Sequence, residues 1–199
     1  MLIRPPLNKE TVWKNISGSN IPRIEKYDFE LEDVYSLKLP FKDKFVFGTG
    51  TNSLNENIQL MKHCINGGID RFLIMPSAYG SYSNDGAYAF YANIVQKVPE
   101  SKIILYNFQK LSHFLFSPEL VTKLASDFPE QILGVKDSSY NLFETLKIPN
   151  FLIFPGSETK LLKGLELGCS GIISAICNVT APVARKVYDD FHNKKKQTF

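Results

Sequence analysis

A lysine stands directly after an apolar run in the segment ILGVKDSS, residues 132–139. If this run forms a buried strand, Lys136 lies at the end of the strand and is partly removed from water. Burial disfavours the ammonium form of a lysine, and the neutral amine is a nucleophile toward carbonyl carbons. A structural role is also open, in which Lys136 forms a salt bridge with Asp137 or Glu158. The pattern alone favours neither interpretation.

A tyrosine ends the preceding apolar run, in the segment IILYN, residues 103–107. The hydroxyl of Tyr106 could move a proton between a substrate oxygen and a carbinolamine intermediate. Taken alone, Tyr106 is better explained as a rim aromatic whose hydroxyl is hydrogen-bonded. Because the carboxyl ends of parallel strands meet at one edge of a sheet, Tyr106 and Lys136 are expected to reach the same substrate. This pairing strengthens the chemical interpretation of both residues.

Other polar groups carry weaker signals. The turn Gly48-Thr49-Gly50 lacks the GxGxxG spacing of a phosphate-binding loop, so a tight turn between strand and helix explains it better. His113 follows the strand that ends at Tyr106 and could face the site, whereas His63 and His192 fall on helices and suggest no metal. The three cysteines have no CxxC spacing, which predicts neither a disulfide scaffold nor a zinc site.

Short apolar runs recur every 20 to 30 residues and alternate with helical patterns. The predicted strands are 45–47, 72–75, 103–106, 132–135, 151–154 and 171–174, and the predicted helices are 54–67, 117–127, 158–168 and 181–192. Continuous apolar strands are typical of a parallel sheet that helices cover. The alternation therefore predicts an α/β fold with a parallel sheet.

Six strand–helix units are recognisable, whereas a closed (β/α)8 barrel has eight and roughly 250 residues. Residues 1–44 contain scattered charges, four prolines and only weak apolar runs. We therefore predict an atypical N-terminal segment over 1–44 and a partial barrel domain over 45–199. The pattern leaves open a six-unit open sheet or a barrel that lacks its first two units.

Composition excludes several classes of protein. With 199 residues, 44% hydrophobic and 22% charged, the chain has the composition of a globular protein rather than a disordered one. A net charge of +3 is too small to indicate nucleic-acid binding, and the lysines 194–196 are expected to be a solvated helix end. The sequence shows neither a signal peptide nor an apolar run of membrane-spanning length. We predict a soluble cytoplasmic protein.

Five segments together resemble one family: FGTGTNSLNENIQLMK, IILYN, SPELVTKLAS, ILGVKDSS and GLELGCSGIISAICN. In order and spacing, from about residue 45 to about residue 190, they are similar to the dihydrodipicolinate synthase / N-acetylneuraminate lyase family of class I aldolases. The resemblance implies a TIM barrel whose lysine, here Lys136, forms a Schiff base with pyruvate or another 2-oxo acid. It also implies that Tyr106 relays protons and that Gly156 and Ile173 line the pyruvate pocket.

The same resemblance implies a lyase or aldolase that needs neither a metal nor an organic cofactor, because the protonated imine is the electron sink. Its partners would be a 2-oxo acid and an aldehyde, with no nucleic acid and no membrane, in a homo-oligomer that is commonly a tetramer in the family.

The chain departs from the family pattern at several positions. It has no Thr-Thr pair, so the Gly-Thr-Thr-Gly-Glu turn that holds the pyruvate carboxylate is missing, and the first two strand–helix units are missing or replaced by residues 1–44. Gln109 stands where the family has a proline, and Leu111 where dihydrodipicolinate synthases have an arginine. Tyr79 is a loose match to a family tyrosine. We therefore expect a 2-oxo acid aldolase for a sugar-acid-like substrate; the alternative is a catalytically impaired fragment or binding scaffold.

Overall fold

Six short parallel strands form one sheet, and each strand pairs with the next one in the sequence. The protein is represented by a computed structural model that describes residues 2–3, 45–79 and 82–193. The strands are β1 (Leu2–Ile3), β2 (Val46–Gly48), β3 (Arg71–Ile74), β4 (Lys102–Asn107), β5 (Ile132–Asp137) and β6 (Leu152–Pro155). Five of the six predicted strands are confirmed, with ends that differ by two residues or fewer.

Helices follow β2, β3, β4 and β6, whereas a loop joins β5 to β6. They are α3 (Leu54–Asn66), α4 (Asn84–Lys97), α5 (Gln109–Ser112), α6 (Pro118–Asp127), the 3-10 turn η2 (Glu158–Lys160), α7 (Leu161–Glu166) and α8 (Cys177–His192). Helices α3, α4 and α6 begin in the same way. A serine at the N-cap (Ser53, Ser83 or Ser117) accepts a hydrogen bond from the amide three residues later, which satisfies one of the free N–H groups of the first turn.

Helix α4 is absent from the sequence prediction, because Asn84-Asp85-Gly86 at its start is typical of a turn. The signal that identifies it is Ser83, whose hydroxyl accepts the N–H of Gly86 at 3.1 Å. The predicted helix 158–168 is divided into η2 and α7, and the predicted helix 181–192 begins earlier, at Cys177.

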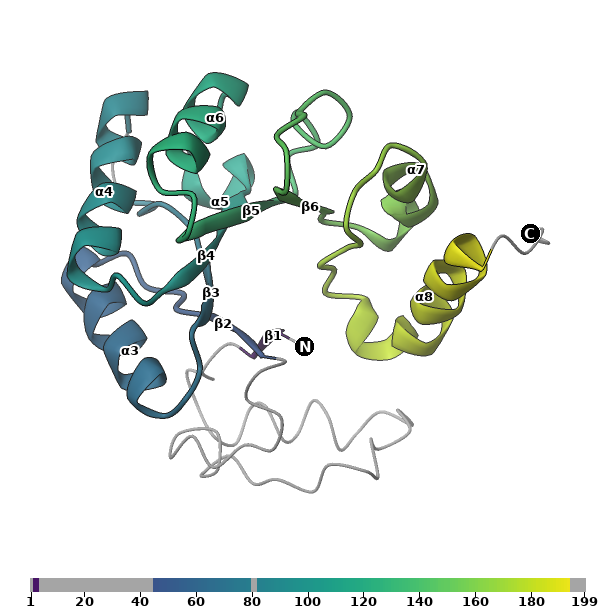
Figure 1. Cartoon of the computed structure of the whole chain (residues 1–199), viewed down its shortest axis with the longest axis horizontal. Helices are drawn as coiled ribbons and strands as arrows, with labels where there is room; N and C mark the ends of the chain where they lie inside the picture. Colours follow the sequence, from purple (N-terminus) through teal and green to yellow (C-terminus); the bar gives the residue numbers. More distant parts are fainter. Residues whose placement is uncertain (1, 4–44, 80–81, 194–199) are drawn as a thin grey trace.

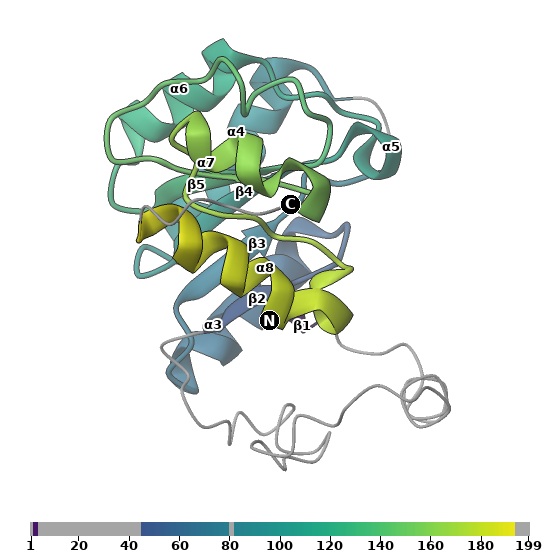
Figure 2. The same cartoon turned by 90° about the vertical axis from the view of Figure 1, so that its right-hand side faces the viewer.

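The sheet separates two apolar clusters. The larger one lies between the strands and α3, α4 and α6, and includes Phe72, Ile103 and Val135. The smaller one lies on the other face of the sheet and contains Leu73, Ile104 and Tyr106. In Figure 1 the strands follow a curve, with α3, α4 and α6 on its outer side, and Figure 2 shows the same layers from the side. Side chains alternate between the two faces along each strand, so neighbouring residues serve different clusters.

Parallel strands in sequence order, with helices on the outer face, have the topology of a (β/α)8 barrel. The fold prediction of an incomplete barrel is therefore confirmed: within the described ranges the sheet has six strands, and β6 does not pair with β1. Strand β1 belongs to the predicted N-terminal segment 1–44 and pairs in parallel with β2. The remainder of that segment and the lysines 194–196 lie outside the described residues, so the division at residue 44 stays a prediction.

The predicted strand 171–174 is wrong. The segment runs beside β6, but Ser170 donates to the Ile153 carbonyl at 2.9 Å and Ile173 donates to the Pro155 carbonyl at 3.2 Å. The two donors are three residues apart in this segment, but the two acceptors are only two residues apart in β6. The pairing register therefore shifts by one residue between the two hydrogen bonds. Gly171, at φ 145°, absorbs the extra residue in a conformation that other residues rarely adopt. The slip prevents a regular ladder, so no strand forms.

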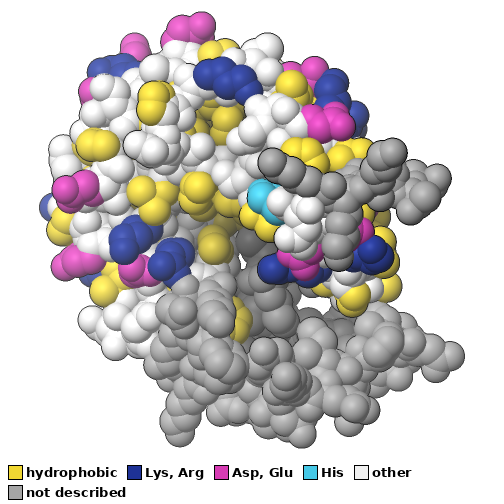
Figure 3. Space-filling view, turned by 45° about the vertical axis from the view of Figure 1, so that its right-hand side comes forward, with side chains coloured by type: hydrophobic (Ala, Val, Ile, Leu, Met, Phe, Trp, Pro, Cys, Tyr) yellow, Lys and Arg dark blue, Asp and Glu magenta, His cyan; other side chains and the backbone are white. Residues whose placement is uncertain are grey.

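Helix α8 contributes no fully buried side chain, and its exposed apolar residues Val179 and Val183 lie one turn apart, close to Ile176 at its N-cap. Figure 3 shows apolar and charged side chains next to each other at the surface on this side of the molecule. Among the helices of the described residues, none is long and apolar enough to cross a membrane.

Candidate active site

Lys136 and Tyr106 lie side by side on neighbouring strands. They are register partners in the pairing of β4 with β5, and the Lys136 Nζ lies 4.1 Å from the centre of the Tyr106 ring. Each residue is only 7% exposed. The structure therefore brings together the two residues for which the sequence suggests carbonyl chemistry, on the inner face of the sheet.

The surroundings of Lys136 are mostly apolar. Its register partner on the other side is Phe154 of β6, and Phe108 stacks on the Tyr106 ring with centroids 6.0 Å apart. An ammonium group is costly to hold in such surroundings, and the face of an aromatic ring offsets part of that cost by a cation–π interaction. The Lys136 side chain thus lies against an aromatic ring and is nearly buried.

Asp137, the first salt-bridge partner suggested for Lys136, serves another purpose. Adjacent residues of a strand point to opposite faces, and Asp137 is fully buried on the helical side. Its carboxylate accepts hydrogen bonds from the N–H groups of Tyr140, Leu142 and Phe143 at 2.8–2.9 Å, and from the Asn107 side chain at 2.8 Å. Asp137 therefore organises the loop after β5, and the suggested salt bridge to Lys136 is wrong for this carboxylate.

Glu158, the second suggested partner, begins η2 after β6. Its carboxylate accepts a hydrogen bond from the Ser174 hydroxyl at 2.8 Å. Hydrogen bonds from its own backbone N–H, and then from Ser174 and Ser157, hold the pKa of this carboxyl below its ordinary value. An ionised carboxylate and two hydroxyls therefore lie together at the start of η2.

Gly156 closes the gap between the ends of β5 and β6. Its N–H donates to the Asp137 carbonyl at 2.9 Å, and a Cβ at this position would lie 2.1 Å from the Ser138 Oγ. Only glycine allows the two strand ends to approach so closely, next to Lys136. Ile173, whose N–H donates to Pro155, packs partly buried against the cluster that contains Tyr106.

Two other predicted residues do not join this group. The Tyr79 side chain is 90% exposed, and its N–H donates to the Ser77 hydroxyl at 3.2 Å. His113 is exposed and ends α5 with a positive φ of 56°. The role predicted for Tyr79 in substrate binding stays a prediction.

The turn Gly48-Thr49-Gly50 is stabilised by a buried asparagine of α3. Asn57 accepts a hydrogen bond from the Thr49 hydroxyl and donates to the carbonyls of Thr51 and Ser53 at 3.1 and 2.9 Å. Because the Thr49 side chain is 4% exposed and serves the turn itself, the interpretation as a tight turn is confirmed.

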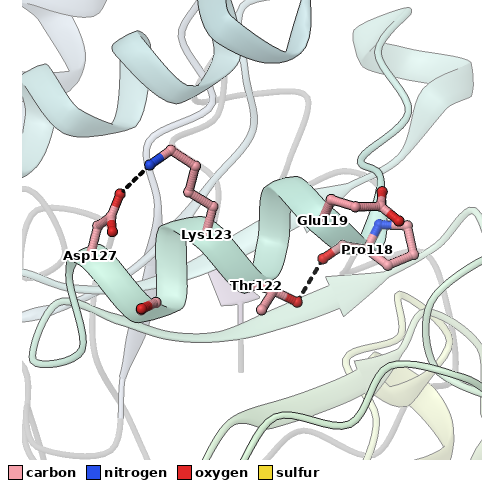
Figure 4. Close-up of a pocket in the computed structure, with 6 residues that line it drawn as sticks. Pro118, Glu119, Thr122, Lys123 and Asp127 are labelled. Carbon is pink, nitrogen blue, oxygen red and sulfur yellow. Dashed lines mark hydrogen bonds and ion pairs between the residues drawn. The ribbon is translucent and has the colours of Figure 1, made fainter.

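A shallow groove lies on the solvent side of α6, away from the inner face of the sheet. Figure 4 shows the Lys123–Asp127 ion pair and the hydrogen bond from Thr122 to the Pro118 carbonyl along this helix. Ion pairs this exposed contribute little to stability, and the groove carries no group that the chemistry of Lys136 requires.

Sulfur and metal chemistry find little support among the described residues. They contain no group of three or more His, Cys, Asp or Glu side chains that could hold a metal ion. Cys64, Cys169 and Cys177 are free thiols, and burial raises the pKa of the Cys64 thiol to about 11. A thiol with so high a pKa is a poor nucleophile near neutral pH.

Comparisons with known proteins place most of the chain, rather than single residues, among its relatives. A profile of the dihydrodipicolinate synthetase family matches residues 42–198. The chain is 29% identical over 160 residues to the 2-dehydro-3-deoxy-D-gluconate/2-dehydro-3-deoxy-phosphogluconate aldolase of Picrophilus torridus, covering 78% of this chain and 59% of that relative. It is 31% identical to the 4-hydroxy-tetrahydrodipicolinate synthase of Listeria monocytogenes over 160 residues, covering 77% of this chain and 54% of that relative.

Among solved structures, the fold is similar to that of YagE, a prophage protein of the dihydrodipicolinic acid synthase family from E. coli K12 in complex with pyruvate. The TM-score is 0.69 at 26% identity, covering 75% of this chain and 52% of YagE. The chain thus spans between half and three-fifths of the length of these relatives.

Proposed function

The chain belongs to the dihydrodipicolinate synthetase family, whose matched relatives include an aldolase and a synthase, and we propose that Lys136 forms a Schiff base with pyruvate or another 2-oxo acid. The observation that carries the proposal is the in-register pair of Lys136 and Tyr106, with the Lys136 Nζ 4.1 Å from the Tyr106 ring centre. The proposed activity is that of a lyase or aldolase.

The reaction begins with the neutral Lys136 amine, which attacks the keto carbon of the 2-oxo acid and gives a carbinolamine. Tyr106 supplies a proton to the departing oxygen, water leaves, and a protonated imine remains. Loss of a proton from the adjacent carbon sends its electron pair into the imine and produces an enamine. The enamine carbon then adds to an aldehyde, whose oxygen takes up a proton, and water hydrolyses the resulting imine to release the product and the free amine. The reverse sequence cleaves the same bond.

For the second substrate we propose a hydroxyl-bearing aldehyde, whose reaction with the 2-oxo acid gives a compound that resembles a sugar acid. Three groups support this choice: Glu158 and the hydroxyls of Ser157 and Ser174 provide acceptors and donors for hydroxyl groups at the carboxyl end of β6. Leu111, 43% exposed on α5, offers no charge to a substrate carboxylate. The name of the Picrophilus torridus relative contains 2-dehydro-3-deoxy-D-gluconate, which is a sugar acid of this kind.

Borohydride trapping tests the proposal. The folded protein is incubated with pyruvate and sodium borohydride, digested, and analysed by mass spectrometry for a reduced adduct on the peptide that contains Lys136. We expect the adduct on Lys136 and none on exposed Lys123, which serves as the internal control. If circular dichroism shows a folded protein and Lys136 gains no adduct, the proposal fails.

The absence of a Thr-Thr pair favours a second candidate, a scaffold of the same family that holds a 2-oxo acid weakly without reacting. Calorimetry with pyruvate separates the two: heat of binding without a trapped adduct supports the scaffold. Light scattering on the same sample measures the oligomeric state, which we predict to be a homo-tetramer.

A further inference from the structure

The two strands that carry Lys136 and Tyr106 are joined by a second pair of residues on the opposite face. Asn107 and Asp137 follow Tyr106 and Lys136 directly, and they are register partners as well. The Asn107 Nδ2 donates to the Asp137 Oδ1 at 2.8 Å, and both residues are fully buried. Two consecutive register pairs of β4 and β5 thus lie on opposite faces of the sheet, Tyr106–Lys136 on one face and Asn107–Asp137 on the other.

Asn107 uses its whole amide group in this arrangement. Besides the bond to Asp137, its Nδ2 donates to the Asn141 Oδ1 at 2.7 Å, and its Oδ1 accepts the N–H of Phe116 at 3.3 Å. Its backbone carbonyl accepts the N–H of Ser138 at 2.8 Å. One side chain therefore connects β4, β5 and the loops that follow both strands.

From this arrangement we propose that Asn107 is a positioning residue, which sets the place of the Lys136 amine relative to the Tyr106 ring. The proposal rests on the proposed function of Lys136 but concerns a residue on the other face of the sheet. Asn107 and Asp137 are the last residues of β4 and β5, and the ladder of these strands shifts register between Ile103 and Ile104. The buried side-chain bond between Asn107 and Asp137, together with the Ser138 N–H donated to the Asn107 carbonyl, joins the two strand ends at this last pair.

Displacement of the strand ends moves Lys136 and Tyr106 apart, because Tyr106 directly precedes Asn107 and Lys136 directly precedes Asp137. A misplacement of roughly 1 Å lowers the rate of a positioned reaction by about 100-fold. A residue that only stabilises the fold would instead lower the folded fraction and leave the remaining folded molecules fully reactive. The two roles therefore differ in what happens within the folded population.

Asn57 provides a matched control. Like Asn107 it is a fully buried asparagine, and its amide also makes three hydrogen bonds, but it lies in helix α3, which follows β2. Its bonds stabilise the turn after β2 and do not involve β4 or β5. Asn57→Ala and Asn107→Ala thus remove the same group and the same number of side-chain hydrogen bonds, one in α3 and the other at the end of β4.

The first measurement follows the Lys136 side chain directly. In protein labelled with carbon-13 lysine, the ε-methylene signal of Lys136, assigned with Lys136→Arg, should be displaced by the ring current of Tyr106. We expect Asn107→Ala to move this signal toward the position of exposed lysines and Asn57→Ala to leave it in place. If the signal stays in place in Asn107→Ala, or moves equally in both variants, the proposal is overturned.

The second measurement is the rate of borohydride trapping with pyruvate, corrected for the folded fraction in each sample. We expect Asn107→Ala to lower the saturating rate by about 10- to 100-fold, and Asn57→Ala to retain it. Equal rates for Asn107→Ala and the unsubstituted protein would overturn the proposal. If the unsubstituted protein gives no adduct at all, the proposed function fails, and the signal of Lys136 alone decides the role of Asn107.

Should Asn107→Ala not fold, Asn141→Ala gives a milder form of the same test. Asn141 is exposed, accepts one of the two Asn107 donations and donates to the Phe116 carbonyl at 2.9 Å. We expect a smaller displacement of the Lys136 signal in the same direction. No displacement in a folded Asn141→Ala protein would contradict the proposal.

Discussion

The Lys136 ammonium lies over the ring of Tyr106, with the nitrogen 4.1 Å from the ring centre. Tyr106 thus has two groups that bear on the lysine: a ring face that stabilises a cation, and a hydroxyl that can carry a proton. The two contributions can be separated by substitution of Tyr106, because phenylalanine retains the ring without the hydroxyl and leucine has neither the ring nor the hydroxyl.

For Tyr106→Phe we expect a loss of about 100-fold in the rate of trapping with pyruvate, because the proton donor is gone while the ring remains. For Tyr106→Leu we expect a larger loss, since the lysine also loses its aromatic wall. Stopped-time borohydride trapping, followed by mass spectrometry of the Lys136 peptide, measures both. A Tyr106→Phe protein that reacts as fast as the unsubstituted one would remove the hydroxyl from the mechanism.

Replacing Lys136 with methionine should separate chemistry from stability. The adduct disappears with the amine, whereas the free energy of unfolding changes by about 1.5 kcal/mol or less, because methionine is an unbranched chain that keeps the apolar part of the lysine side chain. Urea unfolding of Lys136→Met measures this. Lys123→Met is the control: its side chain is 60% exposed, so the Lys136 adduct should persist. Marked destabilisation by Lys136→Met would show that the ammonium is needed for folding.

Gly156→Ala tests the close approach of β5 and β6. A Cβ would lie 2.1 Å from the Ser138 Oγ and 2.8 Å from the Ser138 Cα, so the strand ends must separate. We expect a loss of about 1–3 kcal/mol in unfolding free energy together with slower trapping at Lys136. At Gly86, on the first turn of α4, the nearest atom to an added Cβ is 3.3 Å away on the Tyr82 ring. Gly86→Ala should therefore be close to neutral in both measurements.

The surface ion pair on α6 predicts a small dependence of stability on acid. Hydrogen bonds from Lys123, and then from Tyr88, hold the pKa of Asp127 below its ordinary value of 3.8. A carboxyl whose pKa falls on folding stabilises the protein above its unfolded pKa, and this contribution is lost as the pH drops through the folded value. Urea midpoints between about pH 5 and about pH 2 should therefore fall less steeply for Asp127→Asn. An unchanged slope would mean that solvent screens the pair completely.

The sequence predicts the parts of the fold that depend on local apolar pattern. The runs 103–106 and 132–135 become β4 and β5, and the turn residues after them bring Tyr106 and Lys136 to one edge of the sheet. The fate of 171–174 depends instead on hydrogen-bond register, which a slip of one residue changes without altering the apolar pattern. No property of the single chain segment reveals that slip.

The face of the sheet on which the Asp137 side chain lies is predictable from the sequence, because neighbouring residues of a strand point to opposite faces and Asp137 directly follows Lys136. The network of Asn107 could not, because its partners Phe116, Asp137 and Asn141 are brought together only by the packing of two loops. Tyr79 illustrates the opposite case: a match in residue type says nothing about exposure, and here the side chain is 90% exposed.

The order of the strands has a consequence for how the chain acquires its structure during synthesis. Each of the strands β3, β4 and β5 pairs with the strand that the ribosome delivers shortly before it and with the one that arrives shortly after it. A nascent chain can therefore add one strand and its helix at a time, with short loops to close at every step. The pair β4–β5, with the most extensive contacts of any two elements in the described residues, would be complete before β6 emerges, and so Tyr106 and Lys136 come together before Gly156 and Ile173 join them.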